Sequence, residues 1–214
     1  MNDFLTNWKE NKTYFEALSR MASLTKLFNN YRVPKLDYQF CENCFCKWYN
    51  FNNISVGSSS FDTEKDGLGV GNKTYQYNGN TTLEKVSEFN KIAPELRGLS
   101  NIEIVCKIST LKNERFLKDA EKFKIEKAIY HHVARREKKG IKELLIFNSD
   151  YSLIDISNII ITKNTDKKII FNDGKNEFNF VFSKSTLYQR FIVPEDAVII
   201  PVDICEDPWS LLIK

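Results

Sequence analysis

The stretch Ser58–Lys91, SSSFDTEKDGLGVGNKTYQYNGNTTLEKVSEFNK, decides how this chain can be organised. A short strand-like run ends near Asp62, and a turn rich in Asp and Gly then leads into a second β-like run that carries Lys73. We therefore expect residues 54–77 to form two strands joined by a tight turn. If these strands pair, Asp62 at the end of one strand and Lys73 on the next converge.

The segment after these strands predicts a turn followed by a helix. NGN at 78–80 is typical of a turn, and Thr81 or Thr82 can cap a helix over residues 82–93. On such a helix Glu84 and Glu88 lie one turn apart on the same face.

Composition indicates a globular protein with one sizeable core. The chain has 214 residues, 42% hydrophobic residues and a formal net charge of only +3. No apolar run approaches the roughly 18 residues of a membrane span, and the N-terminus has no apolar signal region. We expect a cytoplasmic protein without a membrane partner. The five cysteines are odd in number and unevenly spaced, which does not suit a disulfide framework.

Helical patterns precede and follow the central stretch. The capping-box pattern of Thr13 and Glu16 predicts a helix over residues 13–29, and a second helix is expected over 40–49. Residues 102–108 read as a buried strand. A long helical region is then predicted over 112–138. It carries both histidines, which are adjacent and therefore face different directions.

The last third of the sequence is richer in β patterns. Residues 168–171 and 177–182 flank NDGKN, a hairpin signal, and residues 198–204 read as another buried strand. We predict an α/β protein with a mixed central sheet flanked by helices. The prediction is one domain, with a helical and catalytic part over 1–140 and a β-rich part over 141–214.

The central stretch contains the side chains that phosphodiester hydrolysis requires. Carboxylates supply the hard oxygen ligands that Mg²⁺ prefers, which makes Asp62 and Glu88 the predicted metal ligands, with Glu84 as an alternative to Glu88. Lys73 beside them can orient the attacking water and offset developing negative charge. No signature of a P-loop, a G-x-S-x-G esterase or an H-E-x-x-H metalloprotease is present.

An acidic residue and a lysine on a β-hairpin, with a helix behind it, resemble the PD-(D/E)XK nuclease superfamily, to which many type II restriction endonucleases belong. Its commonest pattern has an acid two residues before the lysine, where this chain has Gly71. Some members carry that acid on the following helix, which Glu88 matches. Members often place a further Glu on a helix before the hairpin, and Glu42 in FCENCFCKW matches it. GVGNKTYQY, KVSEFNK and SKSTLYQRF are similar to segments of bacterial restriction endonucleases.

The resemblance implies a Mg²⁺-dependent, sequence-specific endonuclease that cuts double-stranded DNA. It also implies a homodimer on a palindromic site and a cognate DNA methyltransferase in the same system. The predicted helical region over 112–138 is the expected source of the dimer interface. Arginine pairs with guanine and glutamine with adenine in the major groove, and lysine and arginine bind phosphates. The predicted DNA contacts are Lys184, Ser185, Gln189, Arg190, Arg135 and Arg136.

Two alternatives remain open from the sequence. Gly71 in the acidic position also fits a non-catalytic DNA-binding or regulatory module on a nuclease-like fold. Cys41, Cys44 and Cys46 form a C-x-x-C-x-C cluster, which supplies three of the four ligands that a structural zinc site requires. The other interpretation of this cluster is a set of reduced cysteines packed as small hydrophobic residues.

Overall fold

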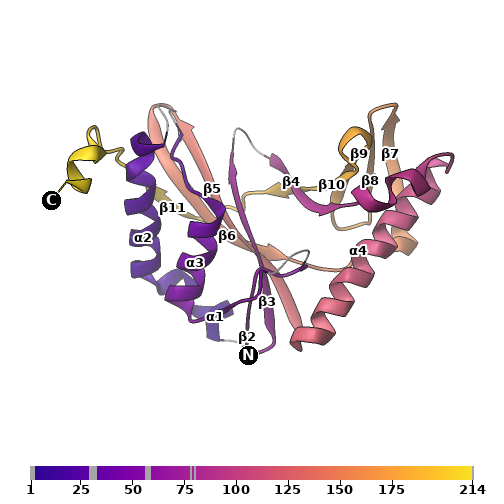
Figure 1. Ribbon diagram of the computed structural model, residues 1–214, viewed down its shortest axis with the longest axis horizontal. Helices are drawn as coiled ribbons and strands as arrows, with labels where there is room; N and C mark the ends of the chain where they lie inside the picture. The colour runs from indigo at the N-terminus through magenta and orange to yellow at the C-terminus, as the bar shows by residue number, and fades with distance from the viewer. Residues whose placement is uncertain (1–2, 29–32, 56–58, 78, 80, 214) are drawn as a thin grey trace. The chain divides into compact units, whose positions relative to one another are not determined.

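The computed structural model describes residues 3–28, 33–55, 59–77, 79 and 81–213. It is a mixed α/β structure that divides into two compact units, each built from separate segments of the chain (Figure 1). Unit 1 comprises Met1–Asn78, Asp119–Tyr151 and Val193–Lys214. Unit 2 comprises Gly79–Lys118 and Ser152–Ile192. These boundaries differ from the division at residue 140 that the sequence suggests.

Unit 1 is organised around a six-stranded mixed sheet with the strand order β1-β2-β3-β5-β6-β11. Strand β3 pairs in parallel with β5, whereas the other neighbouring strands are antiparallel. The strands span Asn52–Asn53 (β1), Thr63–Lys65 (β2), Leu68–Gln76 (β3), Lys127–Lys138 (β5), Ile141–Asp150 (β6) and Val198–Pro201 (β11).

Helices α1 (Asp3–Asn7), α2 (Lys12–Ser23) and α3 (Tyr38–Tyr49) belong to the same unit. Figure 1 shows α2 and α3 side by side, and their apolar side chains share one core cluster with residues of β3, β5 and β6. Helix α2 is capped by Asn11, whose side chain accepts a hydrogen bond from the Tyr14 N–H, and not by the predicted Thr13. Helix α2 is shorter than the predicted helix over 13–29, because it ends at Ser23 and a 3₁₀ helix (Leu24–Leu27) follows. Asn29 itself lies outside the described residues.

The centre of unit 1 contains a buried histidine pair on β5. His131 and His132 are both fully buried, and they face opposite sides of the sheet because successive strand residues alternate. The Tyr14 hydroxyl lies 2.8 Å from His131 Nε2, and Asn148 Oδ1 lies 2.7 Å from His131 Nδ1. Burial lowers the pKa of His131 to about 4, so the neutral imidazole belongs to the packed core.

Unit 2 is a five-stranded antiparallel sheet with the order β4-β10-β9-β8-β7, packed on the first part of helix α4 (Asn101–Phe123). Its strands are β4 (Thr81–Glu88), β7 (Ile160–Thr165), β8 (Lys168–Asn172), β9 (Glu177–Val181) and β10 (Thr186–Ile192). The apolar faces of β8, β9 and β10 meet Ile104, Val105 and Ile108 of α4.

Three secondary-structure predictions were wrong. Residues 82–93 are not a helix, because Thr81–Glu88 pairs along β10 and a 3₁₀ helix (Asn90–Leu96) follows. Residues 102–108 are helical, since a Ser100–Glu103 capping box begins α4 and buries Ile104, Val105 and Ile108. The predicted helical region over 112–138 ends at Phe123 and continues as β5. It therefore cannot supply a dimer interface as one helix.

Most of the other predictions for regular structure are confirmed. Tyr38–Tyr49 is helical, β2 and β3 form the expected hairpin, and β8 and β9 flank NDGKN. The expected strand over 198–204 exists only as β11 (Val198–Pro201), and it is not buried, because its residues alternate between half-buried and exposed. Pro208 begins a short 3₁₀ helix (Pro208–Leu212). Of the predicted NGN turn, residues 78 and 80 lie outside the described part of the chain. No helix within the described ranges combines the length and apolarity needed to cross a bilayer.

Candidate functional site

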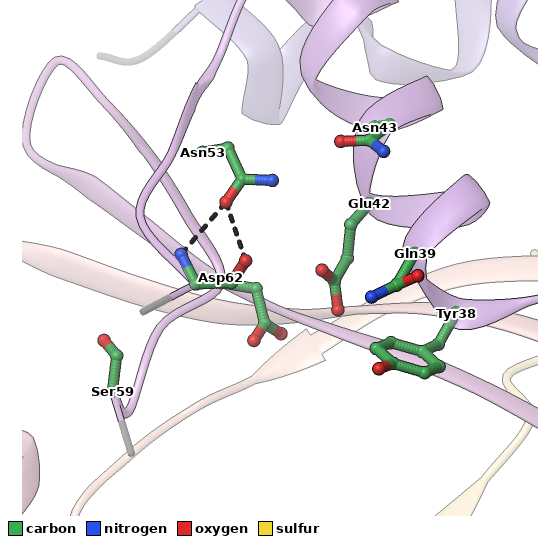
Figure 2. A pocket seen from close by; sticks show the side chains of 8 residues that line it. Tyr38, Gln39, Glu42, Asn43, Asn53, Ser59 and Asp62 are labelled. Atoms are coloured by element: carbon green, nitrogen blue, oxygen red, sulfur yellow. Dashed lines mark hydrogen bonds between the residues drawn. The ribbon is translucent and has the colours of Figure 1, made fainter. Parts of the chain in front are cut away.

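A polar pocket of about 490 Å³ in unit 1 contains two of the predicted acidic residues. Asp62 borders it from the segment that leads into β2, and Glu42 borders it from α3. Figure 2 shows the two carboxylates pointing toward one another across the pocket. The remaining lining is mostly neutral and polar: Tyr38, Gln39, Asn43, Asn53, Ser55 and Ser59.

The hairpin holds Asp62 in place through its backbone and its carboxylate. The Asp62 N–H donates to the Val70 carbonyl at 2.9 Å, and Asp62 Oδ2 accepts the Asn72 N–H at 2.6 Å. Strands β2 and β3 are antiparallel, as the sequence suggested, so Asp62 lies beside the segment that carries Lys73. The convergence of these two residues is a consequence of the hairpin.

Helix α3 presents Glu42 to the pocket because of its helical repeat. Gln39, Glu42 and Asn43 are three and four residues apart and therefore share one face of the helix. The opposite face is apolar, with Cys41 and Phe45 in the core cluster. Asp37 begins the helix by accepting hydrogen bonds from the N–H groups of the first turn.

The two carboxylates disfavour each other's charge. Burial and the neighbouring Asp62 carboxylate raise the pKa of Glu42 to about 7, against the opposing effects of the Ser55 hydroxyl and Lys73. Burial also raises the pKa of Asp62, although the Lys73 ammonium and the Asn72 N–H act in the other direction. Because negative charge is poorly compensated in this pocket, a bound cation stabilises both ionised carboxylates.

The residues of the pocket fit Mg²⁺. The ion is commonly bound by one or two carboxylates, with waters and substrate phosphates completing its octahedral shell. Two carboxylates with neutral amide and hydroxyl groups around them satisfy that pattern. Across the described residues, no group of three or more His, Cys, Asp and Glu side chains is placed to hold a metal ion, so the protein ligands of this pocket are the two carboxylates.

Lys73 lies on β3 next to a stacked pair of tyrosines. Its ammonium is 5.3 Å from the centroid of the Tyr130 ring, a distance suited to a cation–π contact. Tyr130 stacks on Tyr151 with ring centroids 4.0 Å apart and an interplanar angle of 16°. Both rings are buried, so they provide a rigid surface beside the lysine.

The same tyrosine explains Gly71. A Cβ atom added at Gly71 would lie 2.9 Å from Tyr130 Cδ1, closer than real Cβ atoms approach other atoms. Gly71 and Tyr130 are direct partners in the parallel pairing of β3 with β5. The Tyr130 ring therefore fills the space that a side chain at position 71 would need, and Glu42 is the carboxylate that faces Asp62.

Glu84 and Glu88 are part of unit 2 and lie on β4, not on a helix. Glu88 forms a 2.8 Å ion pair with Lys85, and Glu84 Oε1 accepts a hydrogen bond from Thr82 Oγ1 at 2.5 Å. The helical spacing from which we predicted them as metal ligands does not exist. Neither residue lines the pocket in unit 1.

Most of the predicted DNA-contacting side chains make contacts within their own unit. Gln189 is buried and donates to Asn176, and Arg190 pairs with Glu177 at 2.7 Å. Arg135 donates to backbone carbonyls of Pro34 and Tyr75, and Arg136 pairs with Glu143 at 2.7 Å. Ser185 adopts a left-handed backbone conformation in the turn before β10. Lys184 is exposed.

The C-x-x-C-x-C cluster lies on α3 and packs as apolar surface. Cys41 and Cys44 are buried in the core of unit 1, and all three thiols are free. Burial raises the pKa of Cys41 and Cys46 to about 11 and that of Cys44 to about 12. Because Cys41 and Cys44 belong to the apolar core cluster and Cys46 packs against it, packing is the better interpretation of the three cysteines.

Sequence reasoning missed the neutral lining of the pocket. Asn43 could have been found, because it follows Glu42 on the helix predicted over 40–49, whereas Gln39 lies one residue before the predicted start. Asn53 belongs to the two-residue strand β1 and Ser59 to an irregular segment, and neither carries a comparable signal. Neither models of known protein families, nor curated protein sequences, nor solved structures match this chain.

Proposed function

We propose that this protein is a Mg²⁺-dependent, sequence-specific endonuclease that hydrolyses double-stranded DNA, in the manner of a type II restriction enzyme on a PD-(D/E)XK-like fold. The observation that carries the proposal is the pair of facing carboxylates, Asp62 and Glu42, in one pocket beside the strand of Lys73. Glu42 takes the role that the sequence alone assigned to Glu88. A homodimer and a partner methyltransferase accompany this function.

Each of the three residues has a defined part in the proposed reaction. Asp62 and Glu42 hold the cation, and the Asn72 N–H fixes one Asp62 oxygen so that the other can turn toward the metal. Lys73 orients the attacking water and offsets charge that develops on the phosphate. Bound Mg²⁺ acts as a Lewis acid on the phosphate and lowers the pKa of its water.

The first test combines cation binding with cleavage. Calorimetric titration of the purified chain with Mn²⁺ or Mg²⁺ should show binding that Asp62→Asn and Glu42→Gln each weaken. Asp66→Asn is the matched control, because it removes an acid from the same hairpin at a left-handed position that asparagine tolerates. Unmethylated phage DNA should give discrete fragments with Mg²⁺ and none with EDTA.

Three results would contradict the proposal. Cation binding that is unchanged in both carboxylate variants would remove the metal site from this pocket. Cleavage that persists in Asp62→Asn and Glu42→Gln would mean that the active site lies elsewhere. Intact DNA under all conditions, despite normal cation binding, would refute the nuclease.

The alternative function is a non-catalytic DNA-binding module. It is favoured by Gly71, which stands where the common motif has an acid and leaves one metal ligand fewer, and the Tyr130 ring occupies the space that a side chain there would need. This function predicts salt-dependent DNA binding without any cleavage on unmethylated DNA of varied sequence. Binding in EDTA together with absent cleavage in Mg²⁺ would establish it over the nuclease.

A further inference from the structure

The two units differ in charge. Unit 2 contains 13 Lys and Arg residues against 9 Asp and Glu, whereas unit 1 contains 18 against 19. Several acids of unit 2 are neutralised locally, since Glu88 pairs with Lys85, Glu95 with Lys107 and Glu177 with Arg190. The excess positive charge of the chain therefore resides on unit 2.

The strand topology brings four lysines of unit 2 to one end of its sheet. We call this group the basic corner: Lys163, Lys167, Lys168 and Lys184. In an antiparallel meander the β7–β8 turn and the β9–β10 turn lie at the same end. The Phe182 N–H donates to the Lys167 carbonyl at 3.1 Å, which holds the two turns side by side.

The register places two of these lysines on one face of the sheet. Lys163 pairs with Ile170, and Thr165 pairs with Lys168, so the side chains of Lys163 and Lys168 project from the same side. Lys167 lies in the turn between them, and Lys184 ends a 3₁₀ helix (Phe182–Lys184).

The lysines of the basic corner are mostly exposed, and few acidic side chains lie near them in the sequence. Lys163, Lys167 and Lys184 are exposed and Lys168 is half-buried. In the described ranges none of the four forms an ion pair. Asp166 is the acid within the β7–β8 turn. At the opposite end of the sheet the β8–β9 turn has one lysine, Lys175, and the buried Asp173.

We infer that the basic corner binds the phosphate backbone of duplex DNA. The identity of the nucleic acid rests on the proposed function, but the charge pattern does not. Lysines neutralise phosphates as point charges and release condensed counterions, which gives affinity without sequence preference. Phosphate contacts of this kind fix the register of a protein on the duplex while base edges are read elsewhere.

The surroundings favour a duplex over a single strand. Proteins that bind single strands stack the bases on exposed aromatic rings. Large exposed apolar side chains of unit 2, as far as the structure describes it, are aliphatic: Ile102, Leu117, Leu153, Ile160 and Ile192. The basic corner is therefore suited to a backbone of regular charge and not to unpaired bases.

The test compares two triple variants of equal charge. Lys163, Lys167 and Lys184 are replaced by Gln in one protein, and Lys91, Lys118 and Lys175, also exposed on unit 2, are replaced by Gln in the control. Both are made in the full chain carrying Asp62→Asn, and duplex DNA binding is measured in EDTA over a range of salt concentrations. Circular dichroism and melting temperature show that each variant is folded.

We expect the corner variant to lose at least about tenfold in affinity at low salt. The slope of log K against log salt should flatten by about 2.7, since each phosphate contact contributes about 0.9. The control should lose much less. Equal losses of DNA affinity in both variants would mean that only the total charge matters and not the position of the lysines. An unchanged salt slope in the corner variant would show that these lysines do not contact phosphates.

This result is separable from the fate of the nuclease proposal. DNA binding that depends on the basic corner, without cleavage in any divalent cation, would support the proposed binding surface and refute the nuclease proposal. If the corner variant, made with Asp62 intact, cleaves DNA at the parent rate and with the parent KM, the nuclease proposal is supported and the proposed binding surface is refuted. Stronger corner-dependent binding of single-stranded DNA or of RNA than of duplex DNA would overturn the assignment of the partner.

Discussion

The two units of this chain use ionisable residues in opposite ways. Unit 1 directs two carboxylates into a pocket, where burial raises the pKa of both and the Asp62 charge raises that of Glu42 further. Unit 2 pairs three of its nine acids and leaves lysines exposed at one end of an antiparallel sheet. A small net charge of +3 therefore conceals an uneven distribution of charge, on which both of our proposals rest.

The largest expected effect is the loss of DNA cleavage when Lys73 is replaced, compared with the replacement of a lysine elsewhere in unit 1. Lys73→Ala should reduce DNA cleavage by at least about 100-fold, because the group that orients water and offsets phosphate charge is lost. Lys47→Ala, at an exposed position of α3, is the control with the same change in charge. Initial cleavage rates on a plasmid substrate measure the difference, and an equal rate in both variants would exclude Lys73 from the reaction.

A pH experiment tests the buried core of unit 1. The pKa of His131 is lowered from about 6.5 in the unfolded chain to about 4 in the fold, so the unfolded state binds more protons between these values. Stability from this group is complete above about pH 6.5 and is lost as the pH falls toward 4. The loss approaches about 3 kcal/mol.

Urea unfolding of the parent protein and of His131→Gln at neutral and acidic pH provides the measurement. The variant is expected to be less stable at neutral pH, because Tyr14 and Asn148 lose their partner, but to depend less on pH. Parallel pH profiles for the two proteins would show that His131 does not titrate on unfolding.

A glycine pair tests whether the aromatic ring excludes a side chain at position 71. Gly71→Ala should cost about 1–3 kcal/mol in unfolding free energy, because its Cβ meets the buried Tyr130 ring. Gly79→Ala has no heavy atom within 4 Å of the added Cβ and should change stability by no more than about 0.5 kcal/mol. Equal costs would mean that the tyrosine moves aside and that the site can accept an acid.

The smallest effect concerns the paired charges of unit 2. Glu177→Gln breaks the ion pair with Arg190, which also donates a hydrogen bond to Thr81. The loss of unfolding free energy should be less than about 1 kcal/mol, because both side chains of the pair are about one-third exposed. The variant should bind duplex DNA slightly more tightly, since it frees a cation. Weaker DNA binding would show that this pair organises the binding surface.

Local patterns determined the elements whose signals are short in range. The β2–β3 hairpin followed from its Asp-Gly turn, helix α3 from its apolar repeat, and the β8–β9 hairpin from NDGKN. Because Asp62 directly precedes β2 and Lys73 lies on the paired strand β3, their convergence was also predictable. Glu42 was identified through a resemblance, and its helix was correctly placed.

Long-range pairing decided the elements that local patterns misjudged. Residues 127–138 contain Ala, Arg, Glu and Lys, which favour helix, yet they form the strand between β3 and β6, where pairing on both sides outweighs propensity. The same reason applies to β4, which pairs with β10 from more than 90 residues away. The Ser100–Glu103 capping box was a signal in the sequence that could have placed the start of α4.

The sequence by itself determined the hairpin, its acid and its lysine, because turn chemistry and strand alternation act over a few residues. Only the tertiary structure decided that Glu42 faces Asp62, that Tyr130 fills the space beside Gly71, and that four lysines gather at one end of a sheet. Each of these facts depends on which distant segments pair, and pairing is set by the burial of apolar faces over the whole chain.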